Sequence, residues 1–307
     1  MKFTAPFLAL ALLAPFACAQ DKLDLRLRFS KGDVHDMVIN LDQTIDQTIQ
    51  NTRQQTTQSI TIGYTFTVDD LDDQGTASIS VRYKSVAVHS KSQAGEVNYD
   101  STQPGTYVPS VVGNLAALVG QGYSMKIAPS GTVTQVSGLD ALLKLVLGKL
   151  SIPEGPVRTA AELALKQRLD EQNVKASLAS IFAPFPAEPV AIGQSWYHKT
   201  QLNLGFPLTV ETTYTLKSRD NGMATVELVG RASTAPGSTI DLGQQSKMTY
   251  DLQGELHGQI QIQESTGWPW LATTTQTLTG NATVQSPIAP TQVVPITVES
   301  KLKTEQK

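Results

Sequence analysis

The chain has few of the residues that form disulfides, bind metals or act as nucleophiles. Its one cysteine, Cys18, lies among the first twenty residues, and no two of its four histidines have the spacing of a metal site. The sequence has no HExxH, no G-x-S-x-G and no glycine-rich phosphate loop. We therefore predict no catalytic, cofactor-binding or metal-ligating residue. Without a disulfide, stability must come from the hydrophobic core.

Charge is also scarce. Charged residues make up 17% of the chain, the formal net charge is −3, and basic residues do not cluster. A weakly acidic surface without basic patches argues against binding to nucleic acid or to anionic membrane surfaces. After the N-terminus, no apolar run reaches the roughly 20 residues that a transmembrane helix needs.

One acidic segment comes close to a metal-binding motif. Asp70-x-Asp72-x-Gln74-Gly75 resembles the start of an EF-hand loop, but Val81 stands where the bidentate glutamate belongs. The residues on both sides alternate like strands rather than helices. We therefore interpret this segment as a solvated hairpin turn.

The N-terminus has the order of a secretory signal peptide. Lys2 is followed by the short apolar run Phe7–Leu13 and then by Ala17-Cys18-Ala19, a small-x-small cleavage pattern. We predict cleavage after Ala19 and a soluble mature protein, residues 20–307, in the periplasm or cell envelope. The alternative is a lipoprotein whose first residue is a lipidated Cys18, although the residues before Cys18 match that pattern poorly.

Period-two alternation dominates the rest of the sequence. On one face of a predicted long hairpin lie apolar residues that include Met37, Ile39, Leu41, Ile60 and Ile62. Its first arm, residues 34–50, would be about 55 Å long, against 17–20 Å for a typical strand. A strand of that length has to coil. The sequence thus predicts a mainly β protein with a long, curved antiparallel sheet or a half-barrel.

Helical spacing interrupts the alternation in the middle of the chain. An apolar stripe predicts a helix, and it consists of Leu139, Leu142, Leu143, Val146, Leu147 and Leu150. Helix-forming residues continue the pattern to Phe182, and Pro184, Pro186 and Pro189 end it. We expect a first β half at 20–137, a helical segment and proline-rich linker at 138–190, and a second β half at 191–307. Residues 64–81 and 214–228 are alike enough to suggest a duplication.

Trp268-Pro269-Trp270 is the one concentration of aromatic residues, which make up 6% of the chain. Two interpretations are open. Tryptophans beside a tight turn usually cap the end of a β core, and we favour that interpretation because large aromatic side chains tend to be buried. Alternatively, Trp268 and Trp270 form an exposed contact tip that grips a lipid or a sugar.

Two short segments, Met125-Lys126-Ile127…Gly131-Thr132-Val133 and Gly193-Gln194-Ser195-Trp196, resemble elements of uncharacterised families of exported bacterial β-rich proteins and lipoproteins. The resemblance covers most of the mature chain. It implies no site residue, because such families carry no assigned activity. More loosely, the layout is similar to the half-barrels of periplasmic lipoprotein carriers, in fold alone.

An open half-barrel has an apolar concave face that either its own helices or a ligand must fill. We therefore expect a non-catalytic envelope protein that binds a lipid or other hydrophobic molecule, or another envelope protein. A purely structural envelope protein, with its helices filling the concavity, is the alternative. A hydrolase with dispersed catalytic residues comes third.

Overall fold

The computed structural model describes residues 21–149, 155, 158–159, 162–163, 165–166, 169–182, 185–203, 207–235, 238–243, 246–287 and 289–307. The cleavage site after Ala19 and the lipidation alternative at Cys18 lie outside the described residues. Both therefore stay predictions. None of the described helices is long and apolar enough to cross a membrane.

Strands make up most of the described chain. The first six are β1 (Val34–Ile49), β2 (Thr52–Leu71), β3 (Ala77–Ser92), β4 (Gly95–Asp100), β5 (Gly122–Ile127) and β6 (Val133–Ser137). The others are β7 (Ser195–Asn203), β8 (Pro207–Asp220), β9 (Met223–Thr234), β10 (Thr239–Gly243), β11 (Ser246–Gln263), β12 (Pro269–Ser286) and β13 (Ala289–Gln306). The short helices η1 (Ser110–Val112) and α1 (Gly113–Ala116) precede α2 (Leu139–Lys149) and α4 (Glu171–Phe182).

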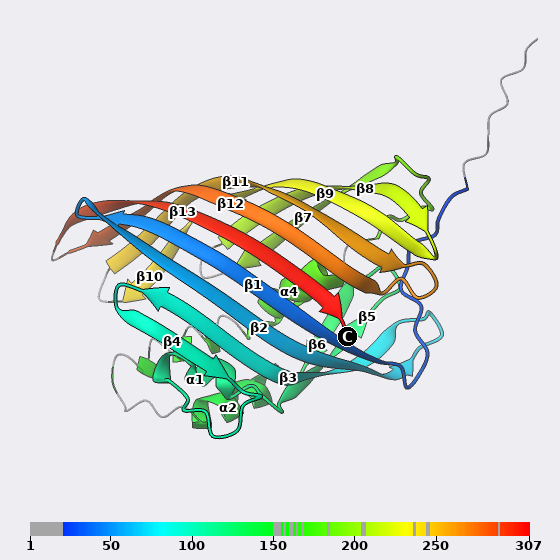
Figure 1. The fold of residues 1–307 in the computed structure, drawn as a ribbon, viewed down its shortest axis with the longest axis horizontal. Coiled ribbons are helices and arrows are strands. Elements are labelled where there is room, and N and C mark those ends of the chain that lie inside the picture. Colours follow the sequence, from blue (N-terminus) through cyan, green and yellow to red (C-terminus); the bar gives the residue numbers. More distant parts are fainter. Residues whose placement is uncertain are drawn as a thin grey trace, which may run out of the picture.

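All these strands belong to one 13-stranded antiparallel sheet. Its order is β6-β5-β3-β2-β1-β13-β12-β11-β9-β8-β7, while β4 pairs with β3 and β10 with β11. Pairing of β1 with β13 joins the two β regions of the chain at the centre of the sheet. The sheet is not a closed barrel, because β6 and β7 remain its edges, and it curves around helix α4 (Figure 1). The predicted mainly β, curved antiparallel architecture is confirmed.

The long hairpin of β1 and β2 also has the predicted faces. Ile39 pairs with Ile62 and Leu41 with Ile60, so these apolar side chains share one face. That face turns toward the helices, and we call it the inner face; the opposite one is the outer face. Polar residues such as Asn40 and Thr61 pair on the outer face, where the Thr61 hydroxyl donates a hydrogen bond to Asn40.

Glycines on the inner face permit the strands to coil closely. A Cβ atom at Gly254 of β11 would lie 1.8 Å from the carbonyl oxygen of Thr277 on β12, and one at Gly280 would lie 1.9 Å from that of Asp251. Leu278 pairs with Gly254 and Leu252 pairs with Gly280, so a large side chain lies opposite each glycine. Only glycine leaves room for the neighbouring strand at these two positions.

The helices close the opening of the half-barrel. Helix α4 contacts β6 and β7, the two edges of the sheet, and α2 contacts β5. Leu142 and Val146 of α2, together with Leu178 and Phe182 of α4, belong to the same buried cluster as the inner-face residues of the strands. The described part of the predicted stripe is therefore buried or partly buried, whereas Leu150 lies outside the described residues.

A segment before β1 crosses one end of the half-barrel. Leu23, Leu25 and Leu27 are buried in the main core, but this segment, residues 23–29, does not join the sheet. We call it the strap. Its backbone bonds to three distant parts of the chain: Leu23 pairs with Val190, and the amides of Leu27 and Arg28 donate to the carbonyls of Pro129 and Thr266. The predicted alternation is present here, but not the strand pairing.

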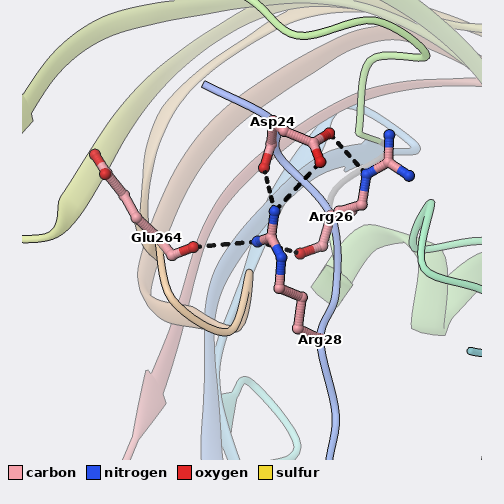
Figure 2. A network of polar contacts seen from close by, with 4 residues as sticks. All are labelled: Asp24, Arg26, Arg28 and Glu264. Carbon is pink, nitrogen blue, oxygen red and sulfur yellow. Dashed lines mark hydrogen bonds and ion pairs between the residues drawn. The ribbon is translucent and has the colours of Figure 1, made fainter. Parts of the chain in front are cut away.

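Charged side chains hold the strap from outside. Figure 2 shows Asp24 accepting hydrogen bonds from Arg26 and Arg28, with the Arg26 Nε atom 2.7 Å from the carboxylate. The Arg28 guanidinium also donates to the carbonyl oxygen of Glu264, at 3.2 Å, in the turn between β11 and β12. On that turn, the Glu264 carboxylate pairs with Arg219, which lowers the pKa of Glu264.

Candidate functional site

The inner face of the central strands carries no charged side chain among the described residues. Its positions are alternate residues at 35–49 on β1, 54–68 on β2, 248–262 on β11, 272–284 on β12 and 294–306 on β13. None of these is Asp, Glu, Lys or Arg. The charges of the same strands, such as Asp42, Glu255 and Lys301, occupy the outer face. The sheet thus separates a charged outer surface from a neutral inner one.

Ionisable groups on the inner face are held in their neutral forms. Burial lowers the pKa of His35 and of His198, which favours the uncharged imidazole. Burial also raises the pKa of Tyr83 and of Tyr214 to about 12, and that of Tyr64 well above its usual value. All five groups are therefore uncharged at neutral pH. An ionised ligand would find no opposite charge on this face.

On β1 and β2, burial of the inner face decreases away from the strap. Near the strap, Met37 and Phe66 are 1% exposed. The next rows, which contain Ile39 beside Ile62 and then Leu41 beside Ile60, are only partly buried although they lie in the middle of the sheet. A strip of partly accessible aliphatic surface therefore lies on the inner face of β1 and β2, beyond the buried core.

Polar side chains without charge form the row after the aliphatic strip. Gln58 of β2 donates a hydrogen bond to the Gln43 side-chain carbonyl, and Gln43 donates to the Ser300 hydroxyl of β13 at 3.1 Å. Gln276 of β12 pairs with Ser300 and continues the row. We call Gln58, Gln43, Ser300 and Gln276 the amide ladder. All four are half-buried.

Sequence reasoning missed this ladder, although a signal was present. Gln43 and Gln58 occupy inner-face positions within otherwise apolar alternation, as do Gln47 and Gln54 nearer the hairpin tip. Gln47 and Gln54 also form a hydrogen bond, at 3.4 Å. Repeated glutamines at positions where the alternation predicts apolar residues indicate a polar group on the buried face. That signal would have identified the ladder as a candidate site.

The two tryptophans of the predicted contact tip occupy different environments. Trp268 is 1% exposed and packs among aromatic rings, with its ring stacked on His35 at a centroid distance of 4.0 Å. Its ring is therefore buried, which is what the favoured interpretation of a core cap requires. Trp270 is 47% exposed, so only this residue retains the contact interpretation, which stays a prediction.

The acidic segment at 69–75 ends β2 at Leu71 and then forms the hairpin turn that leads to β3. One carboxylate oxygen of Asp72 accepts hydrogen bonds from the backbone amides of Gln74 and Thr76, at 2.9 and 2.8 Å. These bonds lower the pKa of Asp72. The Asp72 side chain thus stabilises the turn. No group of His, Cys, Asp and Glu residues suited to a metal ion occurs in the part of the chain that the structure describes.

A shallow depression of about 630 Å³ lies on the outer face, across β3, β2, β1, β13 and β12. Its lining includes the side chains of Asp42, Thr44, His89, Thr275 and Lys301, and the four residues of the amide ladder also contribute to it. Because these side chains are polar and of both charges, the depression does not suit a hydrophobic ligand. The inner face remains the better candidate.

Comparison with known proteins places the chain in a family. No curated protein sequence matches it. Among solved structures, it is similar to lipovitellin, in a study of lipid–protein interactions, with 9% identity and a TM-score of 0.49. That match covers 91% of this chain and 25% of the lipovitellin chain, so the protein spans a quarter of lipovitellin's length.

Bacterial structures match less well. OccK7 (OpdD) of Pseudomonas aeruginosa is 8% identical with a TM-score of 0.24, and 90% of this chain and 99% of that one are covered. An outer membrane channel from Pseudomonas putida F1 is 8% identical with a TM-score of 0.20, at 92% and 97% coverage. A family model matches most of the chain: residues 74–269 fit DUF6263, and the chain belongs to this family of unknown function.

Proposed function

We propose that this protein is an exported, non-catalytic protein of the cell envelope that binds a hydrophobic molecule on the inner face of its sheet. The observation that carries the proposal is the partly accessible aliphatic strip formed by Ile39, Leu41, Ile60 and Ile62 on a face without charge. An uncharged concave surface with a few polar groups is typical of sites for apolar ligands.

The helices are the movable cover of this site. Leu143 and Leu147 of α2 are partly buried against the main core cluster, whereas Leu145 on the same helix is 38% exposed. Contacts of this kind are worth up to about 1.5–3 kcal/mol for a fully buried leucine. They hold α2 against the sheet at β5 when no ligand is bound. We propose that a ligand entering the strip displaces them.

Weakening the cover is expected to raise ligand binding. In the double variant Leu143→Ala with Leu147→Ala, the affinity for a fluorescent monoacylglycerol should increase several-fold while the circular dichroism spectrum of the sheet is unchanged. Fluorescence titration measures the change. Leu145→Ala is the matched control, because its side chain faces solvent on the same helix, and its affinity should equal that of the wild type.

A structural role makes a different prediction in the same experiment. If the helices simply complete the core, neither the wild type nor the double variant binds the probe, and amides of α2 and α4 are protected from hydrogen exchange as strongly as those of the strands. That outcome would favour the alternative of a purely structural envelope protein.

The location is tested separately. If the leader is cleaved after Ala19, N-terminal sequencing of the mature protein from its native cell should begin at Gln20. A diacylated Cys18 as the first residue would contradict the soluble form and place the protein on a membrane. In that case Leu23, the first buried residue of the strap, would lie five residues from the lipid anchor.

A further inference from the structure

The amide ladder has hydrogen-bonding capacity beyond what its own bonds use. A glutamine side chain offers two N–H donors and a carbonyl with two lone pairs. Gln43 gives one N–H to Ser300 and accepts one from Gln58, so a second N–H and a lone pair remain for another partner. The hydroxyl of Ser300 also retains its own hydrogen to donate. These donors and acceptors alternate along the part of the ladder that crosses β2, β1 and β13.

The ladder lies directly beside the aliphatic strip. Leu41, Leu302 and Ile60 form the row on its strap side, and Ile45 pairs with Val298 in the row on its tip side. Polar groups that can both donate and accept thus stand between two apolar rows. This surface is complementary to a molecule with an acyl chain, which would lie on an apolar row, and a compact polar head, which would lie on the ladder.

Charge decides which head fits. Asp42 on β1 and Glu299 and Lys301 on β13 are the nearest charged neighbours of Gln43 and Ser300, and their side chains point to the outer face. The inner-face histidine and tyrosine groups are neutral. An ionised carboxylate in this place would lose its hydration without gaining a cation, which is unfavourable. A hydroxyl-bearing head exchanges its water for ladder hydrogen bonds at little cost.

We infer that the ligand is an uncharged acyl amphiphile with hydroxyl groups in its head, such as a monoacylglycerol, and that Gln58, Gln43 and Ser300 bind that head. This inference rests on the proposed function. It goes further in predicting that the site discriminates against ionised fatty acids of the same chain length.

Calorimetry on the mature chain, residues 20–307, tests the inference with two soluble probes, monodecanoylglycerol and decanoate at pH 8. The wild type should bind monodecanoylglycerol at least about tenfold more tightly than decanoate. Gln43→Leu removes the central member of the ladder without a large change of volume. It should weaken monodecanoylglycerol binding about tenfold, the size of a lost set of hydrogen bonds, and leave decanoate binding unchanged.

Two further variants serve as a second test and as a control. Gln58→Leu removes an end of the ladder and should show the same selective loss, so the test survives if Gln43→Leu fails to fold. Gln253→Leu is the matched control, because this exposed glutamine lies on the outer face of β11, and its binding should be that of the wild type.

Each outcome separates the inference from the proposed function. If the wild type binds the two probes equally, or if Gln43→Leu and Gln58→Leu fold but lose both probes alike, the ladder does not recognise the head and only the inference is overturned. If the wild type binds neither probe, both the inference and the proposed function are overturned.

Discussion

Replacing Gly254 by alanine should lower the free energy of unfolding by about 3 kcal/mol, the upper end of the usual cost of overpacking. The added Cβ would lie 1.8 Å from the Thr277 carbonyl oxygen of the neighbouring strand. Because that atom belongs to the backbone, β11 and β12 would have to separate where they coil most closely. Thermal unfolding should show a decrease in Tm of about 6–12 °C for a chain of this size.

Gly148→Ala supplies the matched control. Gly148 lies in α2, and a Cβ there would meet no atom within 4 Å. Alanine favours a helix over glycine by about 1 kcal/mol, so this variant should be as stable as the wild type or slightly more so. Equal losses of stability in the two variants would show that the inner-face glycines do not determine the curvature of the sheet.

Trp268→Ala is expected to have the largest effect on the core, a loss of about 3–5 kcal/mol. Its ring contacts the rings of Phe29, Phe66 and Phe182 at centroid distances of 5.9, 5.7 and 5.1 Å, in addition to the stacked His35. These residues come from the segment before β1, the first hairpin and helix α4. Removing the indole leaves a cavity where these parts of the fold meet.

Urea denaturation measures that loss, and Trp270→Ala is its control. Trp270 is two residues away but half-exposed, so its truncation should change the free energy of unfolding by no more than about 0.5 kcal/mol. If Trp270→Ala destabilised the protein as much as Trp268→Ala, the two side chains would share one buried environment. The assignment of Trp268 as the core cap would then be wrong.

Part of the candidate site was accessible to sequence reasoning. Alternation alone places Ile39, Leu41 and Gln43 on one face of β1, because successive side chains of a strand point to opposite sides. It does not show that Gln43 meets Ser300, which lies 257 residues away. That contact depends on the pairing and register of β1 with β13, which sequence spacing leaves undetermined.

The strap also shows that the sequence pattern does not determine backbone pairing. Leu23, Leu25 and Leu27 alternate as in a strand, and their burial agrees with that pattern. Yet their backbone bonds to Val190, Pro129 and Thr266 instead of to a neighbouring strand. A period of two reports which side chains are buried, whereas the partner of each backbone group depends on what the rest of the chain places beside it.

The sequence by itself determined the mainly β class, the faces of the long hairpin, the turn at Asp72 and the described part of the helical stripe, Leu139 to Leu147. Each of these depends on residues close together in the chain, where propensity and periodicity act directly. Only the tertiary structure decided that β1 joins β13, that α4 bridges the edges β6 and β7, and that Trp268 is buried while Trp270 is not. These features depend on contacts between segments far apart in the chain, whose partners are chosen by packing and register rather than by local pattern.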